Sequence, residues 1–381
     1  MKVSLTDICD FQGGTQPPKD EWIDQPAQGY VRMLQIRDFT QSDKNYIEYV
    51  KDTGKLKTCI EDDILIGRYG ASIGKILTGL AGAYNVAIVK TIPDEKVVSK
   101  KYLYWYLNSQ YFQRFISNVG SRAAQAGFNK NDLGAAQIPL VDKERQEEIC
   151  EVLEKANKLI SLRKQQLAKL DELIKARFVE MFGDEQAFNK EPLSQNVEEM
   201  FIGPFGSSLK NESFVSKENG YCMVYEQKHA IRKTMDVETR YIDKPKYEEL
   251  KRFSIHGGDI IVSCRGTIGE TYIVPLNAPL GIMHPSIMKI RVKDSIYNRV
   301  FFDFLLQEKL KQHEAQANGS GVKMAVTASA LGKEEFIVPS IPFQNQFAAF
   351  VERVDQQKQT VQQSLEKLEL MKKALMQEFF G

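Results

Sequence analysis

The chain has 381 residues, of which 43% are hydrophobic, and its 51 Lys and Arg against 50 Asp and Glu leave a formal net charge of +1. This length provides for two or three globular domains, and the composition excludes a disordered, collagen-like or disulfide-stapled chain. The five cysteines are scattered without a C-x-x-C pair, and neither a long apolar run nor a secretory signal stands out. We therefore expect a cytoplasmic protein with reduced thiols, no membrane span and no structural metal.

Residues 1–141 are expected to form a first globular domain of mixed helices and strands. A buried strand starts at Asp63 and runs into a glycine-containing turn that ends at Ile73-Gly74, with Arg68 immediately before the turn. A β-branched strand over 85–91, one aromatic-rich helix over 101–118 and a polar loop over 120–132 follow.

Residues 142–183 are expected to form one long helix. Apolar side chains recur alternately every four and three residues, which is the period of a coiled-coil seam. The segment contains no internal proline or glycine, and Gly183 stands where the helix would end. At 1.5 Å per residue such a helix is about 60 Å long. The predicted seam positions are Ile149, Leu153, Ile160, Leu167, Leu170 and Ile174.

Residues 184–341 repeat the plan of the first domain. The strand from Asp259 passes through Arg265 to Ile268-Gly269, and Phe201-Ile-Gly203 matches Phe11-Gln-Gly13 near the start of the chain. A strand over 286–293, a helix over 299–317 and a polar loop over 318–330 complete the repeat. An Arg before a glycine turn in both copies has the reach to contact a phosphate or a guanine. The alternative is that the glycines only shape a turn and that the Arg is solvated.

Residues 342–381 are expected to form a second long helix, because 331–381 aligns without a gap with 133–183, including the identical pair Gln146 and Gln344. Its predicted seam positions are Phe347, Val351, Val354, Leu365, Leu368 and Leu375. Two equal seams favour a coiled coil, and the repeated order of domain and helix favours an antiparallel, pseudo-two-fold arrangement. Only basic residues interrupt the seams, and we expect them at the margin: Arg163, Arg177, Lys358 and Lys372. The alternative is two unrelated amphipathic helices.

No catalytic motif stands out in the chain. The four histidines (229, 256, 284 and 313) lack metal-ligand spacing, and neither a phosphate loop, a dinucleotide fold nor an Asn-Pro-Pro-aromatic motif is present. Residues 1–132 carry 17 basic and 15 acidic side chains, and residues 184–330 carry 19 of each. Neither segment is basic enough to hold DNA by counterion release alone. Either the cations gather on one face or a basic partner supplies affinity.

Several stretches resemble the specificity subunits of type I restriction-modification enzymes. These are Phe-Ile-Gly-Pro-Phe-Gly-Ser-Ser-Leu (201–209), the segment 258–269, Val-Pro-Ser-Ile-Pro (338–342) and the two long helices ending in Met-Phe-Gly and Phe-Phe-Gly. The resemblance covers essentially the whole chain. The first half departs from the pattern, since Phe11-Gln-Gly-Gly-Thr-Gln-Pro-Pro replaces the Gly-Pro-Phe-Gly-Ser form.

The resemblance implies a non-catalytic subunit in which residues 1–141 and 184–341 are target-recognition domains, each reading one half of a bipartite, asymmetric site in double-stranded DNA. The helices 142–183 and 342–381 would set the spacing of the half-sites. Two modification subunits, carrying S-adenosylmethionine and the adenine methyltransferase chemistry, would dock beside the helices, and restriction subunits would bring ATP-driven cleavage. This chain itself would hold no cofactor and contact no membrane.

Side chains in the two glycine turns and the two polar loops are the candidate DNA contacts, because their types reach base edges or phosphates. They are Arg68, Tyr69, Ser72, Ser121, Arg122, Gln125, Arg265, Thr267, Ser320 and Lys323. For partner docking we favour apolar residues off the seams: Leu159, Leu162, Phe178, Phe182, Phe350, Leu370, Met376 and Phe380. The alternative is that these pack beneath the globular domains.

Two other functional classes compete with this interpretation. A stand-alone DNA-binding or scaffolding protein would use the helix pair only for assembly and would bind no methyltransferase. A self-sufficient methyltransferase is disfavoured because the chain lacks the corresponding motifs.

Overall fold

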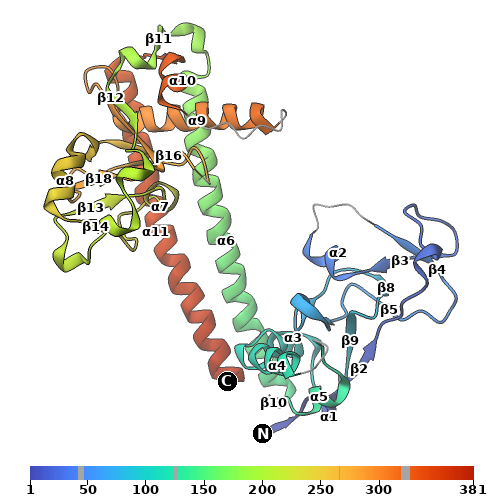
Figure 1. Cartoon of the computed structure of the whole chain (residues 1–381). Coiled ribbons are helices and arrows are strands. Elements are labelled where there is room, and N and C mark those ends of the chain that lie inside the picture. Colours follow the sequence, from blue (N-terminus) through green and yellow to red (C-terminus); the bar gives the residue numbers. More distant parts are fainter. Residues whose placement is uncertain (42–46, 123–126, 266, 319–326) are drawn as a thin grey trace. The chain divides into compact units, whose positions relative to one another are not determined.

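The computed structural model describes residues 1–41, 47–122, 127–265, 267–318 and 327–381 (Figure 1). Its contacts divide the chain into two compact units. Unit 1 consists of residues 1–166 and 361–381, and unit 2 consists of residues 167–360. Each unit therefore combines one globular domain with parts of both long helices.

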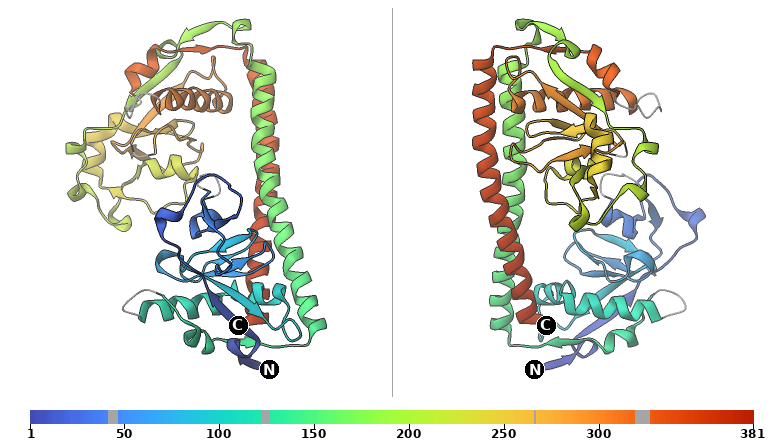
Figure 2. Two further views of the ribbon diagram at one scale, coloured as in Figure 1. Left: turned by 90° about the vertical axis from the view of Figure 1, so that its right-hand side faces the viewer. Right: turned by 60° about the vertical axis from the view of Figure 1, so that its left-hand side comes forward.

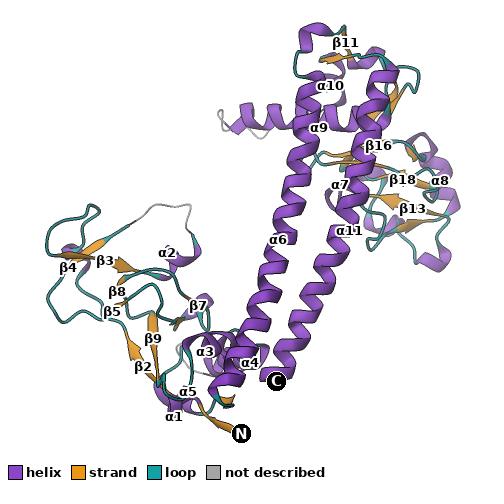
Figure 3. Cartoon of the chain, turned by 180° about the vertical axis from the view of Figure 1, so that it is seen from behind, coloured by secondary structure: helices purple, strands orange, loops and turns teal. Residues whose placement is uncertain are grey.

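The two predicted long helices are present. Helix α6 spans Lys143–Phe182 and helix α11 spans Ile341–Phe380, each with 40 residues (Figure 3). In unit 1 they pack antiparallel, because Lys372 Nζ donates to Asn157 Oδ1 at 2.8 Å while Lys164 pairs with Glu369 at 2.9 Å. The helix pair of unit 2 is joined by an ion pair of 2.7 Å between Lys358 and Asp171.

The seam residues occupy the positions that their periodicity predicts. Most are buried, namely Ile149, Leu153, Ile160, Leu170, Ile174, Phe347, Val351, Val354 and Leu365, while Leu167, Leu368 and Leu375 are half-buried. The basic interruptions lie half-buried, as expected, and find partners there. Arg177 lies over the Phe350 ring, and Lys372 lies over the Trp105 ring at 5.1 Å. Burial acts to lower the pKa of Lys358, but Asp171 and Asp355 outweigh it and the pKa is raised.

Unit 1 is built on short strands and helices. Its strands are β1 (Lys2–Ser4), β2 (Cys9–Gly13), β3 (Tyr30–Leu34), β4 (Tyr49–Lys51), β5 (Thr58–Cys59), β6 (Leu65–Gly67), β7 (Ile76–Leu77), β8 (Gly82–Tyr84), β9 (Ile88–Pro93) and β10 (Gln137–Pro139). Its short helices are α1 (Leu5–Ile8), α2 (Ile36–Thr40), α3 (Lys100–Leu107), α4 (Gln110–Arg122) and α5 (Lys130–Gly134). The strands form two four-stranded sheets, β2-β9-β6-β7 and β4-β3-β8-β5, and the pair β1-β10.

Unit 2 repeats this topology (Figure 2). Its strands are β11 (Lys190–Pro192), β12 (Val197–Ile202), β13 (Cys222–Tyr225), β14 (Tyr241–Ile242), β15 (Ser254–Ile255), β16 (Ile260–Ser263), β17 (Thr271–Ile273), β18 (Gly281–Met283), β19 (Ile287–Val292) and β20 (Glu335–Ile337). Its short helices are α7 (Gln227–Arg232), α8 (Lys244–Leu250), α9 (Arg299–Asn318) and α10 (Ala328–Lys333). The sheets β12-β19-β16-β17 and β14-β13-β18-β15 and the pair β11-β20 follow the same orders. The fold is therefore a duplicated α+β unit, as predicted.

A buried glutamine anchors the start of each long helix. The side chain of Gln146 accepts from Ser99 N and donates to Val97 O and Val141 O, each at 2.9 Å. Gln344 repeats this pattern, accepting from Asn298 N at 2.8 Å and donating to two backbone carbonyls. A buried amide needs hydrogen-bond partners for both its oxygen and its nitrogen. Both copies therefore require a glutamine at this position.

An aromatic residue at the end of each long helix fills the core of a globule. Phe380 is fully buried against Tyr102 and Tyr106, and Phe182 is 1% exposed and packs on Phe301 and Phe343. Phe178 likewise contacts aromatic rings of α9 and α11. The predicted partner contacts through Phe182 and Phe380 are therefore wrong, since these rings bury their apolar surface within the chain, whereas Phe178 is half-buried.

The aromatic segment of the first domain is two helices rather than the single predicted one. Helix α3 ends at Leu107, and α4 begins at Gln110. Between them, Ser109 Oγ accepts from Phe112 N at 3.2 Å and Asn108 Nδ2 donates to Tyr104 O at 2.8 Å. The Ser109 hydroxyl thus caps the amide of Phe112 in the first turn of α4, while the Asn108 side chain adds a second bond to Tyr104 O at the end of α3. The corresponding segment of unit 2 is one helix, α9.

Candidate nucleic-acid interface

In each unit several loops meet at one end of a four-stranded sheet, namely β2-β9-β6-β7 in unit 1 and β12-β19-β16-β17 in unit 2. In unit 1, β2 ends, β9 begins, β6 ends and β7 begins at the same level, as the pairs Gly13–Val89 and Gly67–Ile88 show. We name the loops at this end the loop edge of unit 1, residues 14–18, 68–75 and 85–87. The loop edge of unit 2 consists of residues 203–208, 264–265, 267–270 and 284–286 and is formed by β12, β16, β17 and β19 in the same way.

Close backbone approach holds each loop edge together. A Cβ on Gly14 would lie 2.1 Å from Asn85 O, and one on Gly203 would lie 2.3 Å from His284 O. Any side chain at these two positions would therefore push the first loop away from the third. Gly14 and Gly203 are equivalent, since their amides donate to Ile88 O and Ile287 O, respectively.

The strand register corrects two matches that sequence comparison predicted. Leu65 pairs with Lys90 and Ile261 pairs with Lys289, so Gly67 corresponds to Ser263 and Arg68 corresponds to Cys264. Arg68 and Arg265 are therefore not equivalent, and the same register aligns Phe201 with Gln12 rather than with Phe11. Short glycine-rich segments can be aligned one residue apart with similar matches. Only the hydrogen bonds to a neighbouring strand decide which alignment is correct.

Arg68 and Tyr69 link the glycine turn of unit 1 to the end of its polar loop. Arg68 Nε donates to Phe128 O at 2.9 Å, and Tyr69 forms a β-bridge with Gly127. The half-buried Ser72 closes the 3-10 turn Gly70–Ser72 by donating its amide to Tyr69 O. Tyr69 remains 41% exposed, so it presents a ring and a hydroxyl beside a guanidinium that is already fixed.

The corresponding loop of unit 2 leaves Arg265 and Thr267 exposed. Ser263 Oγ donates to Thr267 O at 2.6 Å and accepts from Glu270 N at 3.0 Å, which stabilises the turn from inside. Burial raises the pKa of the neighbouring Cys264 thiol to about 11, so this cysteine is a packing residue. Arg265 is thus carried at the tip of a braced loop.

For the remaining predicted DNA contacts the structure describes no side-chain positions. Ser121 and Arg122 belong to the end of α4, while Gln125, Ser320 and Lys323 lie outside the described residues.

Each unit also contains a charged cluster that the sequence did not predict. In unit 1, Glu48 accepts from Lys19 Nζ at 2.5 Å and from Gln35 Nε2 at 2.6 Å and pairs with Arg37. In unit 2, Glu226 pairs with Lys228 at 2.8 Å and with Arg240. Burial acts to raise the pKa of Glu226, but these two cations outweigh it and hold the pKa below its ordinary range. No short motif marks these clusters.

Two histidines of unit 2 make its stability sensitive to acid. Burial lowers the pKa of His229 and of His284 below the ordinary value of 6.5. Below about pH 6.5 the unfolded chain therefore binds protons that the folded unit does not. As the pH is lowered, the free energy of unfolding decreases by at most about 1.4 kcal/mol per pH unit for each histidine.

Replacing His284 with Asn should remove its share of this acid sensitivity. Asn85 is the equivalent residue of unit 1 and accepts from Ala87 N just as His284 Nδ1 accepts from Ser286 N, so H284N is expected to fold. Denaturation at pH 7 and pH 5.5 should show a smaller loss of unit 2 stability for H284N than for the wild type. Equal losses would contradict the assignment.

The described residues contain no group of three or more His, Cys, Asp or Glu side chains arranged to hold a metal ion. Among them no helix is long and apolar enough to cross a membrane.

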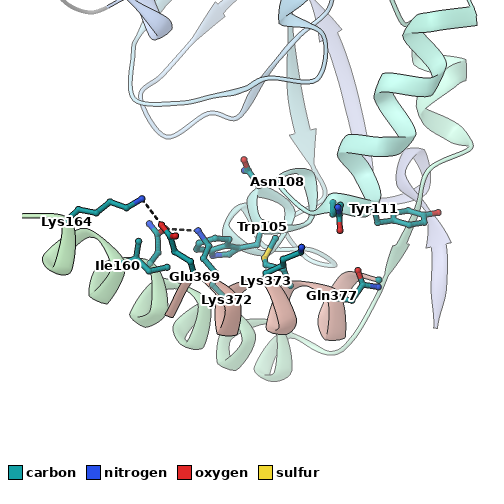
Figure 4. A pocket seen from close by; sticks show the side chains of 13 residues that line it. Trp105, Asn108, Tyr111, Ile160, Lys164, Glu369, Lys372, Lys373 and Gln377 are labelled. Atoms are coloured by element: carbon teal, nitrogen blue, oxygen red, sulfur yellow. Dashed lines mark hydrogen bonds and ion pairs between the residues drawn. The ribbon is translucent and has the colours of Figure 1, made fainter. Parts of the chain in front are cut away.

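A second candidate surface is a groove in unit 1 between α3, α4 and the two long helices (Figure 4). Its floor includes Trp105 and Ile160, and its rim carries Lys164, Lys372 and Lys373. Burial, and then the charge of Lys164, lowers the pKa of Lys372. Exposed apolar residues of the long helices in the same unit do not line this groove: Leu159 (45%), Leu162 (48%) and Leu370 (68%). The other predicted docking residues, Phe350 and Met376, are half-buried.

Comparison with known proteins agrees with this architecture. The type I restriction enzyme MjaVIII specificity subunit of Methanocaldococcus jannaschii is 20% identical over 396 residues, covering 98% of this chain and 90% of that protein. A solved chain described under complex assembly and conformational transition of the type I R-M system superposes with a TM-score of 0.66 at 14% identity, covering 100% of this chain and 97% of that chain. The type I restriction-modification system S subunit from M. genitalium gives 0.52 at 16% identity, covering 100% and 96%.

The family of the type I restriction modification DNA specificity domain matches this sequence twice, over residues 1–172 and 202–370. The two matches correspond to the two copies of the duplicated fold. The chain therefore belongs to the type I restriction-modification specificity subunits, whose role is DNA sequence recognition.

Proposed function

We propose that the loop edges of unit 1 and unit 2 each read one half of a bipartite, asymmetric DNA site. The observation that carries this proposal is a duplicated sheet whose two loop edges expose different side chains. Unit 1 exposes Tyr69 beside Arg68, whereas unit 2 has the buried Cys264 at the position of Arg68 and exposes Arg265 and Phe205. Two readers of one fold but different surface chemistry would recognise two different sequences, and that makes the target asymmetric.

The long helices would determine how far apart the two half-sites lie. Neither helix contains a proline or glycine beyond its first turn. The length of a rigid spacer between two DNA readers sets the number of base pairs between their targets, since half-site spacing is geometric. The chain itself is non-catalytic, as its family relatives are specificity subunits.

Shortening both helices by one heptad tests the spacing function. Deleting residues 163–169 together with 361–367 removes opposed stretches and preserves the phase of both seams. Seven residues correspond to about 10 Å of helix, which is about three base pairs of B-DNA. The methylation pattern of the host genome should keep both half-site sequences while the preferred spacer shortens. An unchanged spacer would contradict the proposal.

We further propose that the exposed leucines of α6 dock the modification subunit. An exposed leucine pair on a helix that is already packed on its other side marks a surface for a partner. S-adenosylmethionine and ATP would then be held by the partner subunits, with two modification subunits in the methylating complex.

Introducing charge at this surface should release the modification subunit. The double variant L159K/L162K is expected to fold normally, because both side chains are about half exposed, yet to lose at least tenfold in affinity for the modification subunit. I60K, which charges a more exposed apolar residue (60%) of the globular domain rather than of a long helix, serves as the control. Co-purification provides the measurement. Equal recovery of the modification subunit with both variants would exclude this docking surface.

A further inference from the structure

Phe205 is an exposed aromatic residue at the loop edge of unit 2. Its side chain is 86% exposed, whereas the other phenylalanines of the unit that the structure describes are buried or half-buried. A ring left in water costs the folding free energy that its burial would have contributed. The exposed ring adds little to the stability of this chain and is available to contact another molecule.

The loop that carries Phe205 is braced on both sides. Pro204 before it is buried, and Leu209 after it is 5% exposed within the core formed with Val224 and Ile282. Between them, Ser208 N donates to Phe205 O at 2.8 Å in a 3-10 turn, and Gly203 rests against His284 O. The ring is thus held out on a short, well-anchored tip, so its insertion elsewhere costs little conformational entropy.

The loop edge of unit 2 also places Phe205 with the candidate DNA contacts. Phe205 follows the end of β12, and Arg265 follows the end of β16 at the same end of the sheet. In unit 1 the residue two positions after the equivalent glycine, Gly14, is the polar Gln16. The apolar tip is therefore a feature of one reader only.

We propose that Phe205 inserts between two stacked base pairs of the half-site read by unit 2. Apolar side chains that enter a base step partly unstack it and kink the duplex. This inference rests on the proposed reading of DNA by both units and adds a deformation that only one half-site undergoes. The half-site of unit 2 would accordingly favour a flexible pyrimidine–purine step at the insertion point, because such steps are easily unstacked.

The complex of this chain with its modification subunits provides the test. Duplexes bearing the methylated target site carry 2-aminopurine in turn at each position of both half-sites, except at the methylated adenine, which the partner extrudes. The wild-type complex should raise the fluorescence at one step of the unit 2 half-site only. F205A should abolish that rise and weaken binding by 10- to 100-fold, F205L should retain part of both, and Q16A should leave the unit 2 half-site unchanged.

Each alternative result has a distinct meaning. Wild-type fluorescence and affinity in F205A would overturn the insertion while leaving recognition intact. Loss of the modification subunit from F205A would also overturn it and would make Phe205 a protein contact. Absence of sequence-specific binding by the wild-type complex would overturn the proposed function itself. Thermal unfolding of F205A should match the wild type, because the side chain is already exposed.

Discussion

Replacing Phe182 with alanine is expected to lower the free energy of unfolding of unit 2 by about 3–5 kcal/mol. The ring is 1% exposed and is surrounded by other aromatic rings at centroid distances of 4.7 to 5.8 Å, contributed by Phe178, Phe188, Phe301, Phe343 and Phe347. The substitution removes the buried apolar area and two edge-to-face contacts, with Phe343 and Phe347, and leaves a cavity among the remaining rings. Because Phe182 ends α6, the loss would also free the last turn of that helix.

Chemical denaturation, followed by hydrogen exchange of amides in unit 2, measures this effect. F205A is the matched control, since it makes the same substitution in the same unit at a side chain that is 86% exposed, and it should shift stability by less than about 0.5 kcal/mol. Similar destabilisation by F182A and F205A would show that the aromatic cluster is not the core of unit 2.

Replacing Arg265 with alanine is expected to weaken recognition of the unit 2 half-site by roughly 10- to 100-fold, corresponding to about 1–3 kcal/mol for one bidentate contact to guanine. The side chain is exposed at the tip of a turn that Ser263 fixes from within, so it is free to reach the major groove. Competition between duplexes with an intact and a scrambled unit 2 half-site measures the loss directly. Discrimination at the other half-site should be unaffected.

Arg68 provides the matched control for Arg265. Its Nε already donates to Phe128 O and it occupies a different register position, so R68A should leave the unit 2 half-site unchanged. A uniform loss of affinity in R265A, equal for both duplexes and steeply dependent on salt, would instead assign Arg265 to a phosphate. Full discrimination in R265A would remove the glycine turn of unit 2 from the interface.

The long helices and the duplication could be predicted because both follow from patterns of contiguous residues. A seam that repeats every seven residues specifies a helix and its buried face wherever the rest of the chain lies. The gapless match of 133–183 with 331–381 likewise needs no tertiary information, and it correctly paired Gln146 with Gln344, whose buried amides make equivalent hydrogen bonds. The break between α3 and α4 was missed because it depends on the polar side chains Asn108 and Ser109.

The candidate interface was only partly predictable. The two glycine turns were found from their sequence, but no motif marked the cluster at Glu48, which joins Lys19, Gln35 and Arg37, or the more local cluster of Glu226 with Lys228 and Arg240. The exposure of Phe205 was likewise invisible, since an apolar residue in a sequence is as easily a core residue as a surface one. The expected docking role of Phe182 and Phe380 failed for the converse reason, because both rings lie under the globules.

The sequence by itself determined that this protein is two copies of one α+β unit joined to two long seam-forming helices. Only the tertiary structure decided which residues of the two copies correspond and which apolar side chains face solvent. The reason is that periodicity and identity are properties of contiguous residues, whereas register is set by hydrogen bonds between distant strands. A shift of one residue in the strand register changes which side chains correspond, as the separation of Arg68 from Arg265 shows.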